Sequence, residues 1–209
     1  MARRMWSLGL ALAVILPRLA WAEAPKAFAN LRDAAQPVES LTAFLSRFVG
    51  TCTDIEERAA CLTNARKARN ELVGKSFYVI LDRDSTRMFK GGSFNPANRE
   101  YTIEMTPFFE AGGLGLTNGE PKGQDSEGRP RIQIEPILMT LPVDVLPMDM
   151  ERLLRTQNVK VHLVFKPLGL WSLPAKSGGP KMDGVNAKFL AVRLTNARDG
   201  EDLALRLEK

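Results

Sequence analysis

Alternation between apolar and polar residues dominates the chain from Lys75 onward and predicts strands that bury one face. Six strands are predicted at residues 77–81, 86–90, 101–105, 132–134, 159–165 and 203–207. A seventh, over residues 188–195, is apolar on both faces, as a central strand would be. Turn sequences separate most of them, and no helix of crossover length lies between successive strands. We therefore expect a protein of the α+β class that is mainly β, with an antiparallel β-sandwich or open barrel of about seven strands over residues 75–209.

Residues 38–74 follow the helical period of three to four residues instead. The apolar residues of the first part form one stripe, and Gly50 stands where a left-handed C-terminal cap is expected, so we predict a helix over residues 39–49. A second helix is predicted over residues 54–74, because capping-box patterns stand at its start. These two helices would form a hairpin docked on the β-domain. A further short helix is predicted over residues 146–156.

The start of the chain has the three parts of a secretory signal peptide over residues 1–22: basic residues, an apolar run over residues 8–17, and a small-x-small sequence that ends at Ala22. A membrane anchor would need roughly 20 apolar residues, and Arg18 interrupts the run before that length. We therefore expect cleavage after Ala22, a periplasmic or secreted location, and no transmembrane segment after processing. Residues 23–37 mix alanine, proline and charge without a sustained period, which predicts a linker.

Composition and charge narrow the classes of partner. The chain is 44% hydrophobic and 25% charged, which is typical of a globular protein. Its formal net charge is +5, and loss of the leader would remove three arginines and no acidic residue, which leaves about +2. A nucleic-acid-binding surface needs clustered positive charge. We therefore do not expect the protein to bind nucleic acid.

Cys52 and Cys61 are the only cysteines, and an exported protein meets an oxidising compartment, so we predict a disulfide between them. It would contribute roughly 2 to 3 kcal/mol to stability. The alternative is a pair of redox-active or metal-binding thiols, although a zinc site needs more ligands than this pair supplies.

His162 is the only histidine, and alternation places it on the strand face of Lys160 and Lys166, which we expect to be exposed to solvent. A Ser-His-Asp unit needs a histidine that a third group orients. One surface histidine beside two lysines does not fit that role. A single histidine also cannot form a multi-histidine metal site. We expect no cofactor.

The sequence Asp82-Arg83-Asp84-Ser85-Thr86 follows an apolar strand. This D-x-D-x-T pattern resembles the first motif of the haloacid dehalogenase-like phosphatases. The resemblance implies a parallel sheet with crossover helices, Asp82 as nucleophile, Asp84 as general acid and base, and a bound Mg²⁺. It covers Tyr78–Thr86, and residues 87–106 predict strand, turn and strand instead of a crossover helix. A hairpin turn whose polar side chains cap their own backbone is the other interpretation.

Two long connections are the segments that we expect to carry function, because loops on a rigid scaffold often do. The first is Pro107–Pro130, whose aromatic residues either pack under the sheet or line a groove, and the second is Gly169–Asn186, whose tryptophan is either a plug or an anchor for a partner. The residues that we expect to bind a partner are Phe108, Phe109, Asn118, Trp171 and Lys181.

The sequence therefore favours an exported binding or scaffold module that contacts a protein or glycan of the cell envelope. The enzyme alternative is a periplasmic Mg²⁺-dependent phosphatase that uses Asp82 and Asp84. A third hypothesis is a structural domain that forms a homo-oligomer by covering its apolar edge strands with a second copy.

Overall fold

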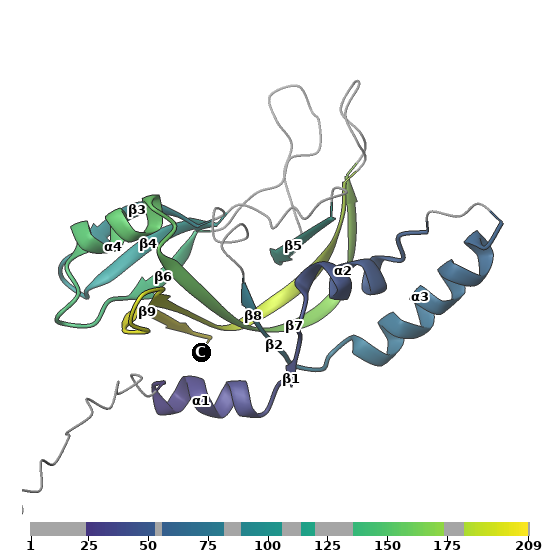
Figure 1. Cartoon of the computed structure of the whole chain (residues 1–209), viewed down its shortest axis with the longest axis horizontal. Helices are drawn as coiled ribbons and strands as arrows, with labels where there is room; N and C mark the ends of the chain where they lie inside the picture. The colour runs from purple at the N-terminus through teal and green to yellow at the C-terminus, as the bar shows by residue number, and fades with distance from the viewer. Residues whose placement is uncertain are drawn as a thin grey trace, which may run out of the picture.

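The computed structural model describes residues 24–52, 56–81, 89–105, 114–119, 136–173 and 182–208. Its centre is one open β-sheet with helices on both faces, so the predicted α+β, mainly β class is confirmed (Figure 1). The strands are β1 (Gln36–Pro37), β2 (Phe77–Leu81), β3 (Phe89–Asn95), β4 (Glu100–Met105), β5 (Leu114–Asn118), β6 (Ile137–Thr140), β7 (Val159–Leu173), β8 (Met182–Asn196) and β9 (Asp202–Leu207).

The sheet is mixed rather than wholly antiparallel. Its order is β1-β2-β7-β8-β9-β6-β4-β3, and β5 pairs with β8 beside this path. The pairs β1–β2 and β5–β8 are parallel, and the other pairs are antiparallel. Both parallel pairs involve a strand that the sequence did not predict. Strand β1 has two residues, one of them Pro37, and β5 lies in a glycine-rich segment, so neither shows a clear alternation.

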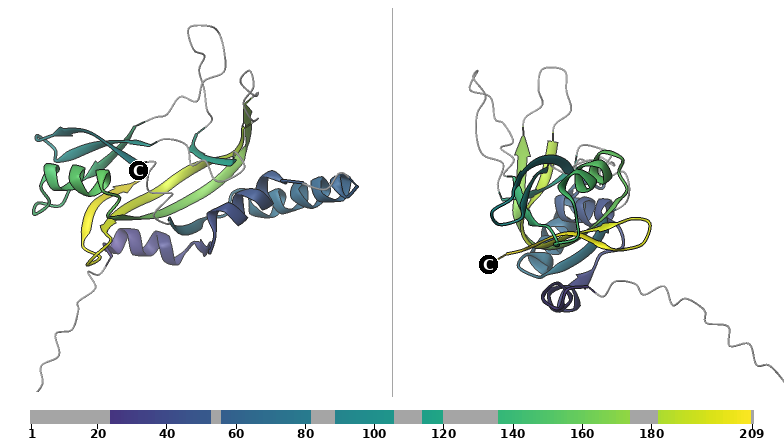
Figure 2. Two further views of the ribbon diagram at one scale, coloured as in Figure 1. Left: turned by 45° about the horizontal axis from the view of Figure 1, so that its top comes forward. Right: turned by 90° about the vertical axis from the view of Figure 1, so that its left-hand side faces the viewer.

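Strands β7 and β8 are the longest elements of the sheet and run as one curved ribbon through the molecule (Figure 2). They pair from Val159↔Asn196 to Leu173↔Met182, well beyond the predicted strands. The register shifts near Val164 and again beside Pro167. Proline cannot donate to a ladder, and such irregularities let a long strand bend past it.

The predicted helical hairpin is present as α2 (Leu41–Val49) and α3 (Arg58–Leu72). The Ser40 hydroxyl accepts a hydrogen bond from the N–H of Ala43, and Gly50 ends α2 in the left-handed conformation with φ 82°. Helix α3 begins later than predicted, and its first flanking residue, Glu57, makes no side-chain cap. The capping residues that we predicted, Thr53 and Asp54, lie outside the described residues.

The predicted disulfide joins the two helices. Cys52, just after α2, and Cys61 of α3 are bonded, with their Cα atoms 6.0 Å apart. The short helix α4 (Pro147–Arg155) also matches its prediction, and Pro147 occupies its first turn.

Residues that the sequence predicted to be a linker form a helix, α1 (Lys26–Asp33), followed by β1. The linker prediction failed because Phe28 is the one buried residue of α1, so no apolar period is visible. Packing of Phe28 on the sheet, with the partly buried Leu31 against the same cluster, holds α1 in place, rather than helix propensity. Among the described residues, no helix combines the length and the apolar character needed to cross a membrane.

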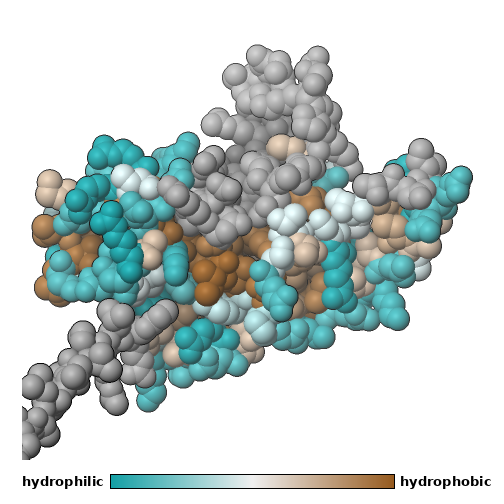
Figure 3. Space-filling view, viewed as in Figure 1, coloured by the Kyte–Doolittle hydropathy of each residue, from teal (hydrophilic) through white to brown (hydrophobic). Residues whose placement is uncertain are grey.

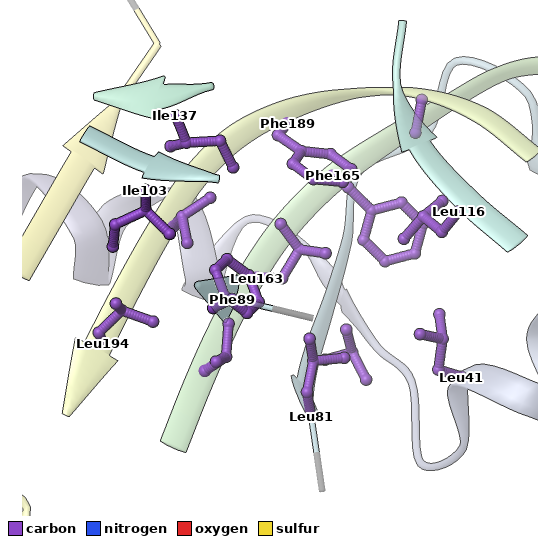
Figure 4. Close-up of a cluster of buried hydrophobic side chains, with 14 of the residues drawn as sticks. Leu41, Leu81, Phe89, Ile103, Leu116, Ile137, Leu163, Phe165, Phe189 and Leu194 are labelled. Carbon is purple, nitrogen blue, oxygen red and sulfur yellow. The ribbon is translucent and has the colours of Figure 1, made fainter. Parts of the chain in front are cut away.

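The main core lies on the face of the sheet that α2 and α4 cover. Side chains from most strands meet there, among them Leu81, Phe89, Ile103, Leu116, Ile137, Leu163, Phe165, Phe189 and Leu194 (Figure 4). A second, smaller core lies on the opposite face beneath α1, where Phe28 packs with Val164 and Ala191. The two ends of the hydrogen-bonded path are β1 and β3.

Candidate functional site

The structure brings described parts of the two long connections together. Strand β5 lies within the first connection and pairs with the start of β8 from Leu114↔Asp183 to Asn118↔Ala187. On its other side this part of β8 pairs with the end of β7. We call these three segments, β5 with Gly169–Leu173 and Met182–Ala187, the arm.

One face of the arm belongs to the main core. Leu114, Leu116, Val185 and Ala187 are at most 3% exposed and pack in that core. Because strand side chains alternate between faces, these residues fix the side chains between them on the opposite face. The arm is therefore anchored through one face, and its other face carries the residues of interest.

Trp171 lies on that opposite face and covers Gly184. Its side chain is 7% exposed, and a Cβ atom on Gly184 would overlap the indole ring and lie 2.7 Å from the carbonyl oxygen of Gly115. Position 184 therefore has no room for a side chain while the ring is in place. The buried ring matches the plug interpretation of Trp171 rather than the exposed anchor.

Two buried polar atoms of the arm lack a hydrogen-bond partner in the described structure, Trp171 Nε1 and Asn186 Oδ1. Asn186 is 8% exposed and follows Gly184 by two residues, so its side chain shares the face that the indole covers. The first atom is a donor and the second an acceptor. Buried polar atoms in folded proteins are hydrogen-bonded in the large majority of cases, so these two mark the arm as a candidate site.

The neighbouring polar residues of β5 are engaged in holding the arm together. The Thr117 hydroxyl donates to the carbonyl oxygen of Gly119 at 2.8 Å. Asn118, which we predicted to bind a partner, accepts a hydrogen bond from the N–H of Phe189 through Oδ1 at 2.9 Å. Its side chain therefore ties β5 to β8. Three further predicted binding residues, Phe108, Phe109 and Lys181, lie outside the described residues.

A second group of polar residues lies where β2, β7, β8 and β9 pass beneath α1. The Tyr78 hydroxyl and His162 Nδ1 are 2.7 Å apart, and His162 Nε2 is 3.3 Å from the Thr195 hydroxyl. Arg193 donates from Nε to Asp202 on the next strand. Phe28 of α1 covers the group and meets the Tyr78 and His162 rings edge-on. We call Tyr78, His162, Arg193, Thr195 and Asp202 the His162 cluster.

The expectation that His162 faces solvent was wrong, because α1 covers this part of the sheet and the sequence did not predict α1. Burial, followed by the positive charges of Arg193, Lys160 and Arg32, lowers the pKa of His162 to about 4. The imidazole is therefore neutral near pH 7. Both of its nitrogens lie within hydrogen-bond distance of a hydroxyl, and Phe28 contacts the ring edge-on.

The residues of the phosphatase resemblance, Asp82 and Asp84, lie outside the described residues. The strand before them, β2, runs antiparallel to β7 along its whole length and is parallel only to the two residues of β1. This is not the parallel sheet with crossover helices that the resemblance implies. Within the described ranges, no group of three or more His, Cys, Asp or Glu side chains is arranged to hold a metal ion.

Two clefts lie outside the arm. The larger, about 540 Å³, runs between α2 and α3 beside Cys61 and has mostly small or charged walls. The smaller, about 330 Å³, lies between β3 and α4 and is lined by Phe89, Lys90, Gly91, Glu151, Leu154, Arg155 and Gln157. We call the latter the β3–α4 cleft. Sequence analysis missed it, because the alternation of β4 marks Tyr101, which lies behind this cleft, only as a core residue.

Comparison with known proteins gives a family without an assigned function. No curated protein and no solved structure matches the chain. The model of one family, described as "Family of unknown function (DUF6066)", matches residues 2–209. Since the match covers almost the whole chain, the protein belongs to this family.

Proposed function

We propose that this protein is an exported binding module of the cell envelope, and that the arm binds a segment of an envelope protein or glycan. One observation carries the proposal. A donor, Trp171 Nε1, and an acceptor, Asn186 Oδ1, are buried on the same face of the arm without partners among the described residues. Because both atoms are buried in this structure, a bound segment would have to displace what covers them before it supplied the hydrogen bonds that they lack.

The chemistry of the two atoms favours a ligand that contains amide groups. An amide has one acceptor oxygen and at least one N–H donor, so a single group can accept from the indole and donate to the asparagine. Peptide backbones and the N-acetyl groups of envelope glycans both contain it.

Two features support export. The first 22 residues have the pattern of a signal peptide, and Cys52 and Cys61 are joined in a disulfide. Disulfides persist mainly in oxidising compartments. Expression of the full chain in a Gram-negative host tests this directly, because intact-mass measurement of the periplasmic fraction should give a protein that begins at Glu23. Material that retains residues 1–22 and stays in the cytoplasm would contradict export.

Binding is tested with Trp171 as its own reporter. In the processed protein, which begins at Glu23, Trp171 is the only indole. We expect its fluorescence to change on titration with either soluble peptidoglycan fragments or short peptides, and the saturation curve gives the dissociation constant.

Variants connect that signal to the arm. Asn186→Ala should weaken binding by at least tenfold, since it removes the unpartnered acceptor. The control is Asn70→Ala, which removes an exposed asparagine on α3 and should leave the dissociation constant unchanged. Equal affinity in the two variants, or no fluorescence change with either probe at millimolar concentration, would contradict the proposal.

A further inference from the structure

Helix α1 is held on the sheet by few contacts. Phe28 is its one fully buried side chain, and Leu31 packs partly buried against the same small core. The N-cap residue, Pro25, makes no side-chain hydrogen bond, and the ion pair Arg32–Asp33 is internal to the helix. In Figure 3 the outer surface over α1 is largely hydrophilic. The helix can therefore leave the sheet as a unit without breaking an ion pair between described residues.

The chain directly after α1 can serve as a hinge. Two backbone hydrogen bonds tie it to the β2 side: the N–H of Gln36 donates to the carbonyl oxygen of Ser76 at 2.9 Å, and the N–H of Val38 donates to that of Tyr78 at 2.8 Å. Both bonds belong to β1 and the residue after it, not to the helix. Release of α1 would therefore leave the strand order intact. Such a local opening requires less free energy than global unfolding.

The surface that α1 covers contains hydrogen-bonding and charged side chains. Phe28 meets the rings of Tyr78 and His162 edge-on, with 6.4 and 6.3 Å between ring centroids. The guanidinium carbon of Arg193 lies 5.7 Å from the centroid of the same phenylalanine ring. When the helix leaves, water can supply hydrogen bonds to these polar groups. The uncovered surface is therefore less costly to expose than a wholly apolar core would be.

The groups around His162 are neutral or positive. They come from each element packed against it: Tyr78 of β2, Lys160 of β7, Arg193 and Thr195 of β8, and Phe28 and Arg32 of α1. Burial raises the pKa of Tyr78, so its hydroxyl is neutral. The carboxylates nearest in the structure are engaged elsewhere, because Asp202 pairs with Arg193 and Asp33 pairs with Arg32. Within the described ranges, no carboxylate forms an ion pair with the imidazole.

A proton on His162 is therefore unfavourable while α1 is docked. Its pKa is lowered to about 4, against the model value of 6.5. The hydroxyls of Tyr78 and Thr195 can both accept from a charged imidazole, so the opposition comes from burial and the neighbouring cations. Release of α1 would hydrate the ring and carry Arg32 away. The released form then binds the proton more tightly, so acid between pH 6.5 and 4 favours release.

We infer that α1 is an acid-released strap, which Phe28 holds over the His162 cluster at neutral pH and which a charged imidazole displaces in mild acid. The strap has two states, docked and released, and His162 is the group through which pH selects between them. Release uncovers Tyr78, His162 and Arg193 on this face of the sheet. The inference does not depend on the binding that we propose for the arm.

Hydrogen exchange followed by mass spectrometry tests the strap. The purified protein is exchanged at pH 7, 6 and 5, and the rates are corrected for the pH dependence of intrinsic exchange to give protection factors. We expect the protection factors of residues 26–35 to fall at least about fivefold between pH 7 and pH 5, since the released form gains protons over this range. Those of α3 and β4, which carry no residue of the His162 cluster, should change less than about twofold.

Variants connect the response to the imidazole. His162→Gln keeps a donor and an acceptor but takes no proton, so the protection of α1 should be equal at pH 7 and pH 5. Arg32→Gln removes a cation that acts on His162 and should reduce the pH response. The matched control is Lys26→Gln, which removes an exposed cation at the other end of α1 and should leave the response unchanged. Phe28→Ala should release α1 already at pH 7.

Three results would overturn the inference. Protection of α1 that stays constant from pH 7 to pH 5 would show that acid does not release it. An equal fall in the wild type and in His162→Gln would assign the response to another group. A simultaneous loss of protection in all elements would show that acid unfolds the whole protein instead. If His162→Gln does not fold, equal pH responses of the surface variants Arg32→Gln and Lys26→Gln would contradict the inference in its place.

Discussion

Strands β7 and β8 carry two polar regions with opposite hydrogen-bond status. In the His162 cluster, beneath α1, no buried side-chain polar atom of the described structure lacks a partner. At the other end of the same strands, in the arm, Trp171 Nε1 and Asn186 Oδ1 both lack one. A rare residue type does not by itself identify a site. His162 is the only histidine of the chain, yet its hydrogen bonds are satisfied, whereas Asn186 has an atom without a partner. The two regions differ more clearly in whether each buried polar atom has a hydrogen-bond partner.

The difference has a simple structural origin. Phe28 covers the His162 cluster, and strands on both sides of β7 supply partners for its side chains: Tyr78 from β2 and Thr195 from β8. The arm has the core on one face and the indole of Trp171 over Gly184 on the other. We therefore interpret the His162 cluster as structural and the arm as the region available to a partner.

The largest expected effect comes from breaking the charge pair of the His162 cluster. Asp202→Ala leaves the Arg193 guanidinium, whose side chain is 7% exposed, without its carboxylate. The Asp202 side chain is 24% exposed, so the pair is part-buried, and its loss should cost about 3 kcal/mol of unfolding free energy, the low end for a buried pair. Denaturant unfolding measures it. Asp149→Ala, which breaks the exposed pair with Arg152 on α4, is the control and should cost less than about 1 kcal/mol.

Acid should weaken the same region by a similar amount. The folded-state pKa of His162, about 4, lies below the unfolded value of 6.5, so the unfolded chain binds more protons between these pH values. Stability is therefore fully present above pH 6.5 and falls as the pH drops toward 4, by up to about 3 kcal/mol. In His162→Gln this component should disappear. Parallel unfolding curves for both proteins across pH 4 to 7 would contradict the structural role of the histidine.

Tyr78→Phe removes a hydroxyl that has a hydrogen-bond partner. It removes the hydrogen bond to His162 Nδ1 and leaves that nitrogen buried under Phe28 without a partner. We expect a loss of about 1 to 2 kcal/mol in unfolding free energy. Thermal and denaturant unfolding at pH 7 measure the change, and a neutral result would show that this bond contributes nothing.

Tyr101→Phe makes the same chemical change at a hydroxyl that lacks a partner and should have the smallest effect. Removal of a buried, unsatisfied group costs nothing and can stabilise the protein by up to about 1 kcal/mol. The two tyrosine variants are thus a matched pair with expected changes of opposite sign. A destabilisation by Tyr101→Phe as large as that of Tyr78→Phe would remove the distinction on which the candidate sites depend.

Much of the fold could be predicted, because the elements that pack against the main core show their period in the sequence. Helix α2 ends at Gly50 as predicted, and strands β2, β4 and β9 lie where alternation placed them. The disulfide followed from there being only two cysteines and an exported chain. Elements held by very few contacts were missed, because α1 buries only Phe28 and β1 has two residues.

The candidate sites were harder to predict, since hydrogen-bond satisfaction depends on tertiary neighbours. Trp171 was selected because it lies in a long connection, yet nothing in the sequence showed that Asn186 would share its face. Tyr101 fitted the core pattern, and nothing in the sequence showed that its buried hydroxyl would lack a partner. The missed helix α1 also explains why the environment of His162 was predicted incorrectly.

The contact between Trp171 and Gly184 makes two positions of the chain interdependent. Any side chain at position 184 would displace the Trp171 indole. The tryptophan at 171 therefore requires glycine at 184, and the two substitutions are not independent. Gly184→Ala alone should disrupt the arm, and a smaller residue at 171 should relieve only part of the strain, because the new Cβ would still lie 2.7 Å from the carbonyl oxygen of Gly115. In other members of the family, we expect a residue smaller than tryptophan at position 171 wherever position 184 carries a side chain.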